Sequence, residues 1–170
     1  MIRLLRHVVA IVVLPFTVAV LVPIWICRRD AISLAVAETP GGIALQAAGV
    51  GVGAVGLVLF WSCLRRFATE GRGTLAPWDP PRELVVSGPY RYVRNPMISG
   101  VVFVLFGEAL VLRSRPHAVW AAAFLALNAL YIPALEEPLL EARFGDAYCE
   151  YRRHVRRFLP RLQPWTPPPG

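Results

Sequence analysis

The residues best suited to chemistry lie together in residues 88–100, which read Gly-Pro-Tyr-Arg-Tyr-Val-Arg-Asn-Pro-Met-Ile-Ser-Gly. Two arginines three positions apart, Arg91 and Arg94, stand there among tyrosines and prolines. An arginine that points into a cavity offers a planar, permanently charged group that binds a carboxylate or a phosphate. Contact with lipid headgroups is the alternative role for each arginine taken alone. We interpret this segment, called the arginine motif below, as the core of a small-molecule site at a membrane surface.

Three glutamates are the candidate acids. Glu136 and Glu137 stand side by side before a proline, at the end of a predicted apolar helix. Adjacent acids cannot share one helix face, so one could accept hydrogen bonds inside a site while the other meets water or an arginine. Glu108 lies within another apolar stretch, where an acid commonly faces a bundle interior or a cavity. Pairing with an arginine is the alternative role for all three.

The composition is that of a membrane protein. The chain has 170 residues, a mean hydropathy of +0.51 and 56% hydrophobic residues, against roughly 45–50% in soluble domains. Its net charge is +7, and all 18 basic residues are arginines, which lie mostly between and after the apolar runs. This distribution favours anchoring at anionic lipid headgroups and argues against nucleic acid as a partner.

Neither a metal site nor a disulfide framework is expected. The cysteines are odd in number, far apart and without ligand spacing, and the histidines are equally isolated. These residues are Cys27, Cys63, Cys149, His7, His117 and His154.

Apolar runs predict four membrane spans, at residues 8–26, 42–63, 98–112 and 118–135. The first run resembles a signal peptide, and Ala35-Val36-Ala37 looks like a cleavage site. The run is longer than a usual signal sequence, however, and charges intervene before that site. We therefore expect a retained first span.

The second run contains Gly51-Val52-Gly53-Ala54-Val55-Gly56, which formally matches a dinucleotide-binding fingerprint. That fingerprint requires a preceding strand within a βαβ unit, whereas this one sits inside an apolar stretch of helical length. Gly49 and Gly53 have the four-residue spacing that lets spanning helices approach closely. The glycines therefore predict helix packing.

After Pro138 the pattern becomes amphipathic and predicts a helix that lies along the membrane surface and closes over a site. Its apolar residues recur at three- and four-residue steps: Leu140, Phe144, Tyr148, Tyr151, Val155 and Phe158. The predicted fold class is thus all-α, an integral membrane helical bundle with about four transmembrane helices and a C-terminal amphipathic interfacial helix. Within this single membrane domain we expect a two-span pair (1–64), a cytoplasmic Pro/Arg-rich loop with the arginine motif (65–96), a helical hairpin with the closing helix (97–162) and a disordered tail (163–170).

The arginines also predict the topology. The N-terminus, the 65–95 loop and the C-terminal segment hold 14 arginines, whereas the two opposite connections hold 4. By the positive-inside rule, both termini and the arginine motif face the cytoplasm of a multi-pass inner or plasma membrane protein.

A longer series of motifs now resembles a known family. The segment 88–96 is followed by Gly100, by the glutamate pair and by Phe144-Gly145-x-x-Tyr148-x-x-Tyr151-x-x-x-Val155-x-x-x-x-Pro160. Over residues 72–162 this combination resembles the isoprenylcysteine carboxyl methyltransferase and phospholipid methyltransferase superfamily. The resemblance implies an integral membrane enzyme that holds S-adenosylmethionine in a cytoplasm-facing pocket. Membrane sterol reductases carry a similar C-terminal pattern.

The resemblance also implies roles for individual residues. Arg94 would meet the carboxylate of the cofactor, and Glu136 or Glu137 its ribose or amino group. If the acceptor is an amine, Glu108 or one of the glutamate pair would remove its proton. The residues that would line or brace the pocket are Tyr90, Arg94, Asn95, Pro96, Gly100, Glu136, Glu137, Tyr148 and Tyr151.

The chain departs from the family pattern at two positions of the arginine motif. Many members have histidine where this chain has Asn95, and a tyrosine commonly stands where it has Ile98. In addition, the fourth predicted span has no arginine before Glu136 to assist a substrate carboxylate. This absence weakens the case for prenylcysteine more than the case for methyl transfer.

The predicted function is therefore S-adenosylmethionine-dependent methyl transfer to a lipophilic acceptor in the membrane. The acceptor could be an isoprenylcysteine-like carboxylate, a phospholipid amine or another lipid, so the expected partner is a membrane lipid or a lipidated substrate. The alternatives are an NADPH-dependent membrane sterol or lipid reductase and a non-catalytic lipid-binding protein. The sequence does not identify the acceptor or the oligomeric state.

Overall fold

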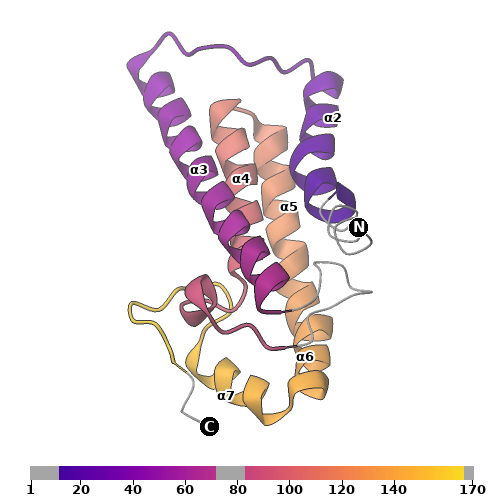
Figure 1. Ribbon diagram of the computed structural model, residues 1–170. Coiled ribbons are helices and arrows are strands. Elements are labelled where there is room, and N and C mark those ends of the chain that lie inside the picture. The colour runs from indigo at the N-terminus through magenta and orange to yellow at the C-terminus, as the bar shows by residue number, and fades with distance from the viewer. Residues whose placement is uncertain (1–11, 72–82, 167–170) are drawn as a thin grey trace. The chain divides into compact units, whose positions relative to one another are not determined.

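The computed structural model describes residues 12–71 and 83–166, and within them the chain is helical and forms no β-strand. Most elements are α-helices, while η1 and η3 are π-helical and η2 is a 3-10 helix. In chain order they are η1 (Val12–Leu21), α2 (Val22–Arg29), α3 (Pro40–Thr69), η2 (Gly88–Arg91), α4 (Pro96–Val111), α5 (Arg115–Tyr131), η3 (Ile132–Glu136), α6 (Glu137–Phe144) and α7 (Asp146–His154) (Figure 1).

The chain divides into two compact units. Unit 1 comprises Met1–Val58 and Gly100–Ala126, and unit 2 comprises Leu59–Ser99 and Leu127–Gly170. The boundaries fall within α3, α4 and α5, so each of these helices contributes residues to both units.

Two helices among the described residues are long and apolar enough to cross a membrane. They are Pro40–Thr69 and the continuous stretch Arg115–Phe144, while Pro96–Val111 is apolar but shorter. Only 11% of the most apolar window of each long helix is buried, whereas the core helix of a soluble protein would be mostly buried. The outward-facing apolar side chains suit a lipid environment. The all-α membrane class is confirmed, and the number of four spans stays a prediction.

Close helix packing in unit 1 depends on glycine, as the spacing predicts. A Cβ atom on Gly49 would lie 2.8 Å from the carbonyl oxygen of Gly107 on α4, and one on Gly56 would lie 2.6 Å from that of Gly100. Gly51 faces open space instead. The glycines of α3 therefore serve helix contact and not a nucleotide-binding turn.

A buried histidine joins α2 to α5 in unit 1. The Nε2 atom of His117 lies 3.3 Å from the carbonyl oxygen of Pro23, an acceptor, so this nitrogen carries the proton. Its Nδ1 atom, 2.7 Å from the Ser114 hydroxyl, is then the acceptor of that bond. Trp120 adds a second link, because its indole nitrogen donates to the carbonyl of Val18 at 3.1 Å. His117, which looked isolated in the sequence, has a structural role that explains its burial.

Unit 2 contains the C-terminal amphipathic segment, divided into two helices. Gly145 separates α6 from α7 with a φ of +54°, a conformation that favours glycine. On α7, Tyr148 and Tyr151 are buried, and together with Val155 they form a small core. The predicted apolar stripe is thus the buried face of this segment.

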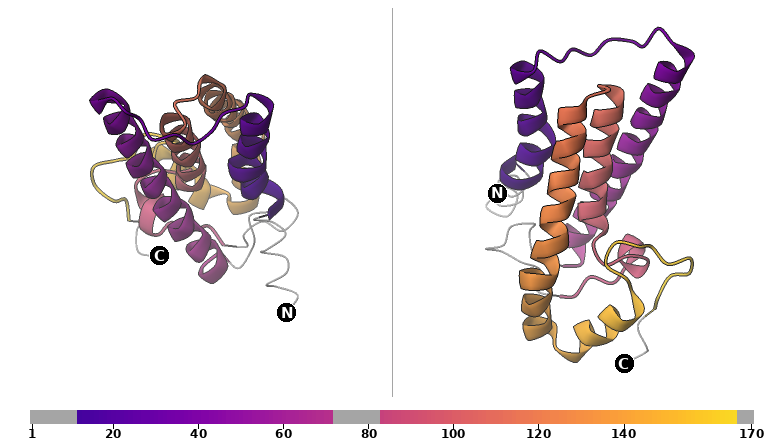
Figure 2. Two further views of the ribbon diagram at one scale, coloured as in Figure 1. Left: turned by 90° about the horizontal axis from the view of Figure 1, so that it is seen from above. Right: turned by 180° about the vertical axis from the view of Figure 1, so that it is seen from behind.

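Residues 155–166, called the C-terminal strap below, pair with the arginine motif through the backbone. The amides of Arg94 and Asn95 donate to the carbonyls of Arg156 and Arg157, at 2.9 and 3.2 Å. The return bonds come from the amide of Arg161 to Tyr92 and from that of Trp165 to Arg91, each at 2.9 Å. Figure 2 (right) shows the yellow strap beside the rose segment that contains η2.

The docking of Trp165 differs from the disordered tail expected from residue 163. Its ring stacks on His154, with centroids 5.5 Å apart, and lies 5.7 Å from Tyr151. The guanidinium of Arg91 donates to the carbonyl oxygen of Trp165 at 2.8 Å. Residues 167–170 of the expected tail lie outside the described residues.

The packing of α3 on α4 gives a direct stability prediction. Gly49→Ala places a methyl group against backbone atoms of α4, which overpacks the contact, so we expect the protein to lose about 1–3 kcal/mol of stability. Gly51→Ala, two residues away in open space, should be neutral or slightly stabilising because alanine favours helices. Thermal unfolding in detergent measures both. Equal midpoints for the two variants would contradict the assigned contact.

Candidate functional site

The start of the arginine motif is fixed to the end of α3 in unit 2. Gly88 has a φ of +50°, and a Cβ atom there would lie 2.2 Å from Nε of Arg66. The Arg66 guanidinium is itself held, because it donates to Glu70 at 2.9 Å and to the Ser87 hydroxyl at 2.7 Å. Ser87 also donates to the Glu70 carboxylate. Only glycine meets both the backbone and the space requirement at position 88.

Two buried tyrosines join η2 to α7. The hydroxyl of Tyr151 donates to the carbonyl oxygen of Tyr90 at 2.6 Å. Burial raises the pKa of Tyr90 well above its ordinary value, and Cys63 beside it adds to the effect. Burial likewise raises the pKa of Tyr151. Both phenols are therefore neutral at physiological pH and act through hydrogen bonds and packing.

An ion-pair centre lies beside these tyrosines and is formed by Glu137, Arg94 and Arg157. Arg157 binds the carboxylate with two nitrogens, at 2.8 and 3.0 Å. Arg94 approaches the same carboxylate at 3.1 Å, and the exposed fractions of the two side chains are only 9% and 8%. A bidentate arginine is a strong partner for a carboxylate. Glu137 is thus held as a carboxylate with both oxygens engaged.

A π-helical turn decides which glutamate of the pair enters this centre. The amide of Glu137 donates to the carbonyl of Ile132, five residues back, and Pro133 lies within the turn. A π turn holds more residues than an α turn, so it changes the helix face on which the following residues lie. Glu137 is buried as a result, while Glu136 is half-buried.

Glu136 differs from its neighbour because its carboxylate has no hydrogen-bond or ion-pair partner among the described residues. Its charge is one of the causes that raise the pKa of Tyr90 and Tyr148, so it belongs to the same cluster. Open acceptor capacity in such a cluster suits a ligand that donates hydrogen bonds.

Tyr148 and Arg94 face each other in this cluster. A guanidinium nitrogen of Arg94 donates to the Tyr148 hydroxyl at 3.4 Å. Burial raises the pKa of Tyr148 to about 12, with smaller opposing contributions from Arg94 and Glu137. The Nε atom of Arg94 is buried and has no partner within residues 12–71 and 83–166. An unsatisfied buried donor of this kind is uncommon and marks where a ligand oxygen would fit.

Asn95 and Pro96 position neighbouring elements. The Asn95 side chain donates to the carbonyl of Arg157 at 3.4 Å, and its own carbonyl accepts bonds from the amide and hydroxyl of Ser99 at 3.1 and 3.0 Å. Pro96 is buried and begins α4. Asn95 therefore connects the arginine motif to the strap and to the first turn of α4.

Gly100 and Glu108 lie on α4 in unit 1, apart from the residues brought together in unit 2. The carbonyl of Gly100 contacts Gly56, as described above. One carboxylate oxygen of Glu108 is buried without a hydrogen-bond partner, and no arginine in the described ranges pairs with this side chain. The alternative in which an arginine neutralises Glu108 therefore gains no support.

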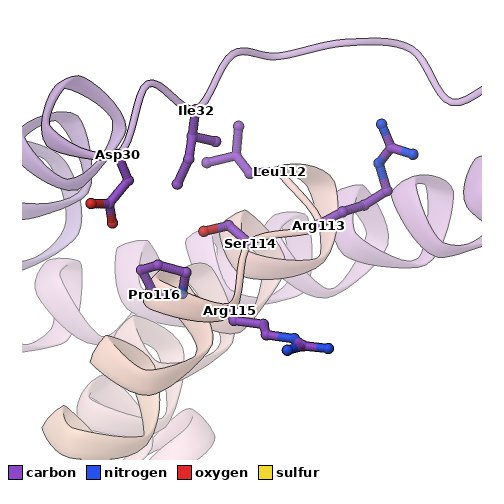
Figure 3. Close-up of a pocket in the computed structure, with 7 residues that line it drawn as sticks. All are labelled: Asp30, Ile32, Leu112, Arg113, Ser114, Arg115 and Pro116. Carbon is purple, nitrogen blue, oxygen red and sulfur yellow. The ribbon is translucent and has the colours of Figure 1, made fainter.

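A hollow of about 400 Å³ opens elsewhere on unit 1, beside the turn between α4 and α5 (Figure 3). None of its lining residues belongs to the predicted site. They are Asp30, Ile32, Leu112, Arg113, Ser114, Arg115 and Pro116.

The structure brings eight predicted site residues into unit 2: Tyr90, Arg94, Asn95, Pro96, Glu136, Glu137, Tyr148 and Tyr151. The sequence analysis missed Arg157, the bidentate partner of Glu137. Arg157 belongs to a cluster with Arg152, Arg153 and Arg156, and the pattern alone does not show which of these four turns inward. The missing signal was a long-range one, the pairing of the strap with the arginine motif.

The groups in unit 2 fit the zwitterionic end of S-adenosylmethionine. The unpartnered Nε atom of Arg94 suits a carboxylate. The open carboxylate of Glu136 suits an ammonium group or ribose hydroxyls, and neutral tyrosines offer apolar walls with a donor at the tip.

Comparison with known proteins agrees with this chemistry. The model of the phospholipid methyltransferase family matches residues 45–147, which is more than half of the chain. The match includes the arginine motif and both glutamates of the pair. Searches of curated proteins and of solved structures gave no match.

The ion-pair centre yields a prediction for Arg157. Arg157→Gln removes two charge-assisted hydrogen bonds from a buried carboxylate, so we expect a loss of about 2 kcal/mol in stability. Arg153→Gln is the matched control, because Arg153 is 75% exposed and lies 3.6 Å from its exposed partner Glu150. Such a surface pair contributes at most about 1 kcal/mol. If thermal unfolding ranks Arg153→Gln as the more destabilised variant, the centre does not hold the strap.

Proposed function

This chain belongs to the phospholipid methyltransferase family, and we propose that it transfers a methyl group from S-adenosylmethionine to a lipophilic acceptor held in the membrane. The observation that carries the proposal is the pair of open groups, Arg94 Nε and Glu136, beside the buried Arg94–Glu137–Arg157 centre. One group is cationic and the other anionic. A zwitterionic amino-acid group complements both.

The proposed roles divide the glutamate pair. Glu137 is a positioning residue, because its oxygens are engaged by two arginines and it fixes the direction of Arg94. Arg94 then presents Nε to the carboxylate of the cofactor. Glu136 accepts hydrogen bonds from the ammonium group or the ribose hydroxyls. Tyr90, Tyr148 and Tyr151 form the walls.

When bound, S-adenosylmethionine supplies a methyl group that its sulfonium has already activated. The protein must therefore align the acceptor with that methyl group and exclude water. Two acids can take a proton from an amine acceptor, because Glu136 and one oxygen of Glu108 have no hydrogen-bond donor among the described residues. Glu137 is less suited, since a carboxylate bound by two arginines is a weak base.

The acceptor that we propose is a membrane lipid, for two reasons. The family description names phospholipids, and the long helices keep apolar side chains at their surface. A phospholipid amine fits better than a prenylcysteine carboxylate, because the fourth predicted span has no arginine before Glu136. We further propose that the site faces the cytoplasm, where the excess of arginines favours placement of the arginine motif.

Cofactor binding tests the proposal and separates it from the reductase and lipid-binding alternatives. The purified protein in detergent should bind S-adenosylmethionine and not NADPH in calorimetric titrations. Glu136→Gln should weaken binding about tenfold or more, the value of a charge-assisted hydrogen bond. Its fold should be unchanged, since no hydrogen bond to its carboxylate is formed within the described residues. Arg94→Ala should weaken binding similarly.

Glu141→Gln is the matched control for these titrations. Glu141 lies on α6 and pairs with the exposed Arg152 at 2.8 Å, so its replacement leaves the proposed pocket intact. Binding of NADPH in place of S-adenosylmethionine would point to a reductase. Absence of binding by a folded protein at about millimolar ligand, the upper end of common Michaelis constants, would overturn the proposal.

A further inference from the structure

The C-terminal strap presents leucines to its surroundings. Leu162 is fully exposed, at 100%, and Leu159 is 64% exposed. This exposure does not come from a loose chain, because Leu162 lies between two anchored amides, those of Arg161 and Trp165. The prolines at 160 and 164 beside these leucines are exposed as well. The strap thus displays a fixed apolar patch, defined here as residues 159–164.

The charge around this patch is entirely positive. Residues 155–166 contain three arginines and no acid. Arg157 is engaged by Glu137, and Arg161 donates to the carbonyl of His154 at 2.9 Å. Arg156 is exposed and forms no ion pair with any residue that the structure describes. One free cation therefore lies close to the exposed leucines, and Arg153, 75% exposed, is near it on α7.

Exposed leucine combined with unpaired arginine is the chemistry of a membrane interface. Apolar side chains enter the boundary between headgroups and acyl chains, while arginines meet anionic headgroups. Nucleic acid would complement the charge but would leave the leucines uncovered. An uncharged apolar partner would leave Arg156 without an anion.

We propose that the C-terminal strap docks on the anionic phospholipid surface of the membrane through Leu159, Leu162 and Arg156. Docking would stiffen the segment whose carbonyls bind the amides of Arg94 and Asn95 and whose Arg157 holds Glu137. The lipid composition of the membrane is thereby linked to the order of the arginine motif. This inference does not rest on the proposed function, because docking requires no reaction.

Hydrogen–deuterium exchange on the full-length protein in nanodiscs tests the inference without an activity assay. One set of nanodiscs contains phosphatidylcholine alone, and the other adds phosphatidylglycerol as an anionic lipid. The amides of Leu159 and Leu162 form no backbone hydrogen bond within the described residues, so they report coverage directly. We expect peptides spanning 158–164 to exchange about fivefold more slowly per engaged arginine in the anionic nanodiscs. The difference should shrink at high salt.

Two variants and one control assign the effect to the strap. Arg156→Gln should remove most of the dependence on anionic lipid, and Leu162→Ser should raise exchange in both lipid compositions. Arg28→Gln is the control, because Arg28 is an exposed arginine at the end of α2 in unit 1. It should leave strap exchange unchanged.

Three results would overturn the inference. The first is equal exchange of the strap in both lipid compositions. The second is an unchanged lipid dependence in Arg156→Gln. The third is protection of the strap by soluble polyglutamate in detergent to the same extent as by anionic lipid, which would identify an acidic macromolecule as the partner.

Discussion

The buried carboxylate of Glu137 sets the main electrostatic constraint in unit 2. A carboxylate that is only 8% exposed is stable when cations and hydrogen bonds replace its water, and Arg157 and Arg94 supply both. Each arginine comes from a different segment, one from the C-terminal strap and one from the arginine motif. A single acid thus holds together two segments that are 63 residues apart in the chain and, through Arg94, directs the group most suited to a ligand.

The surrounding backbone supports this arrangement. The strap and the arginine motif exchange amide hydrogen bonds, and Gly88 lets the motif turn closely against Arg66 at the end of α3. Buried, neutral tyrosines occupy the space between them. Positioning of this kind matters for methyl transfer, because a reaction with an activated methyl group depends chiefly on alignment and on the exclusion of water.

Local patterns predicted much of the fold. The apolar runs indicated the long helices, the spacing of Gly49 and Gly53 indicated close packing, and the three- and four-residue steps indicated the buried face of α7. Each of these signals acts over a few residues, where helical periodicity directly links sequence to contact.

The missed features depend on contacts between distant residues or on a change of helical phase. Arg157 could not be separated from its neighbouring arginines, because only the pairing of the strap brings it to Glu137. The different environments of Glu136 and Glu137 follow from the π turn at Pro133, which alternation on an ideal α-helix does not reveal. Trp165 looked like part of a tail because its partners, Arg91 and His154, lie outside the tail itself.

The central claim, methyl transfer to a membrane lipid, is tested most directly by incubating the purified protein with methyl-labelled S-adenosylmethionine and total membrane lipid. The account predicts that label enters the organic-soluble lipid fraction, that Glu136→Gln and Arg94→Ala lose this activity, and that Glu141→Gln retains it. Label that stays entirely in the aqueous fraction, with a folded protein that binds the cofactor, would contradict a lipid acceptor. Equal labelling by Arg94→Ala and the unaltered protein would contradict the site.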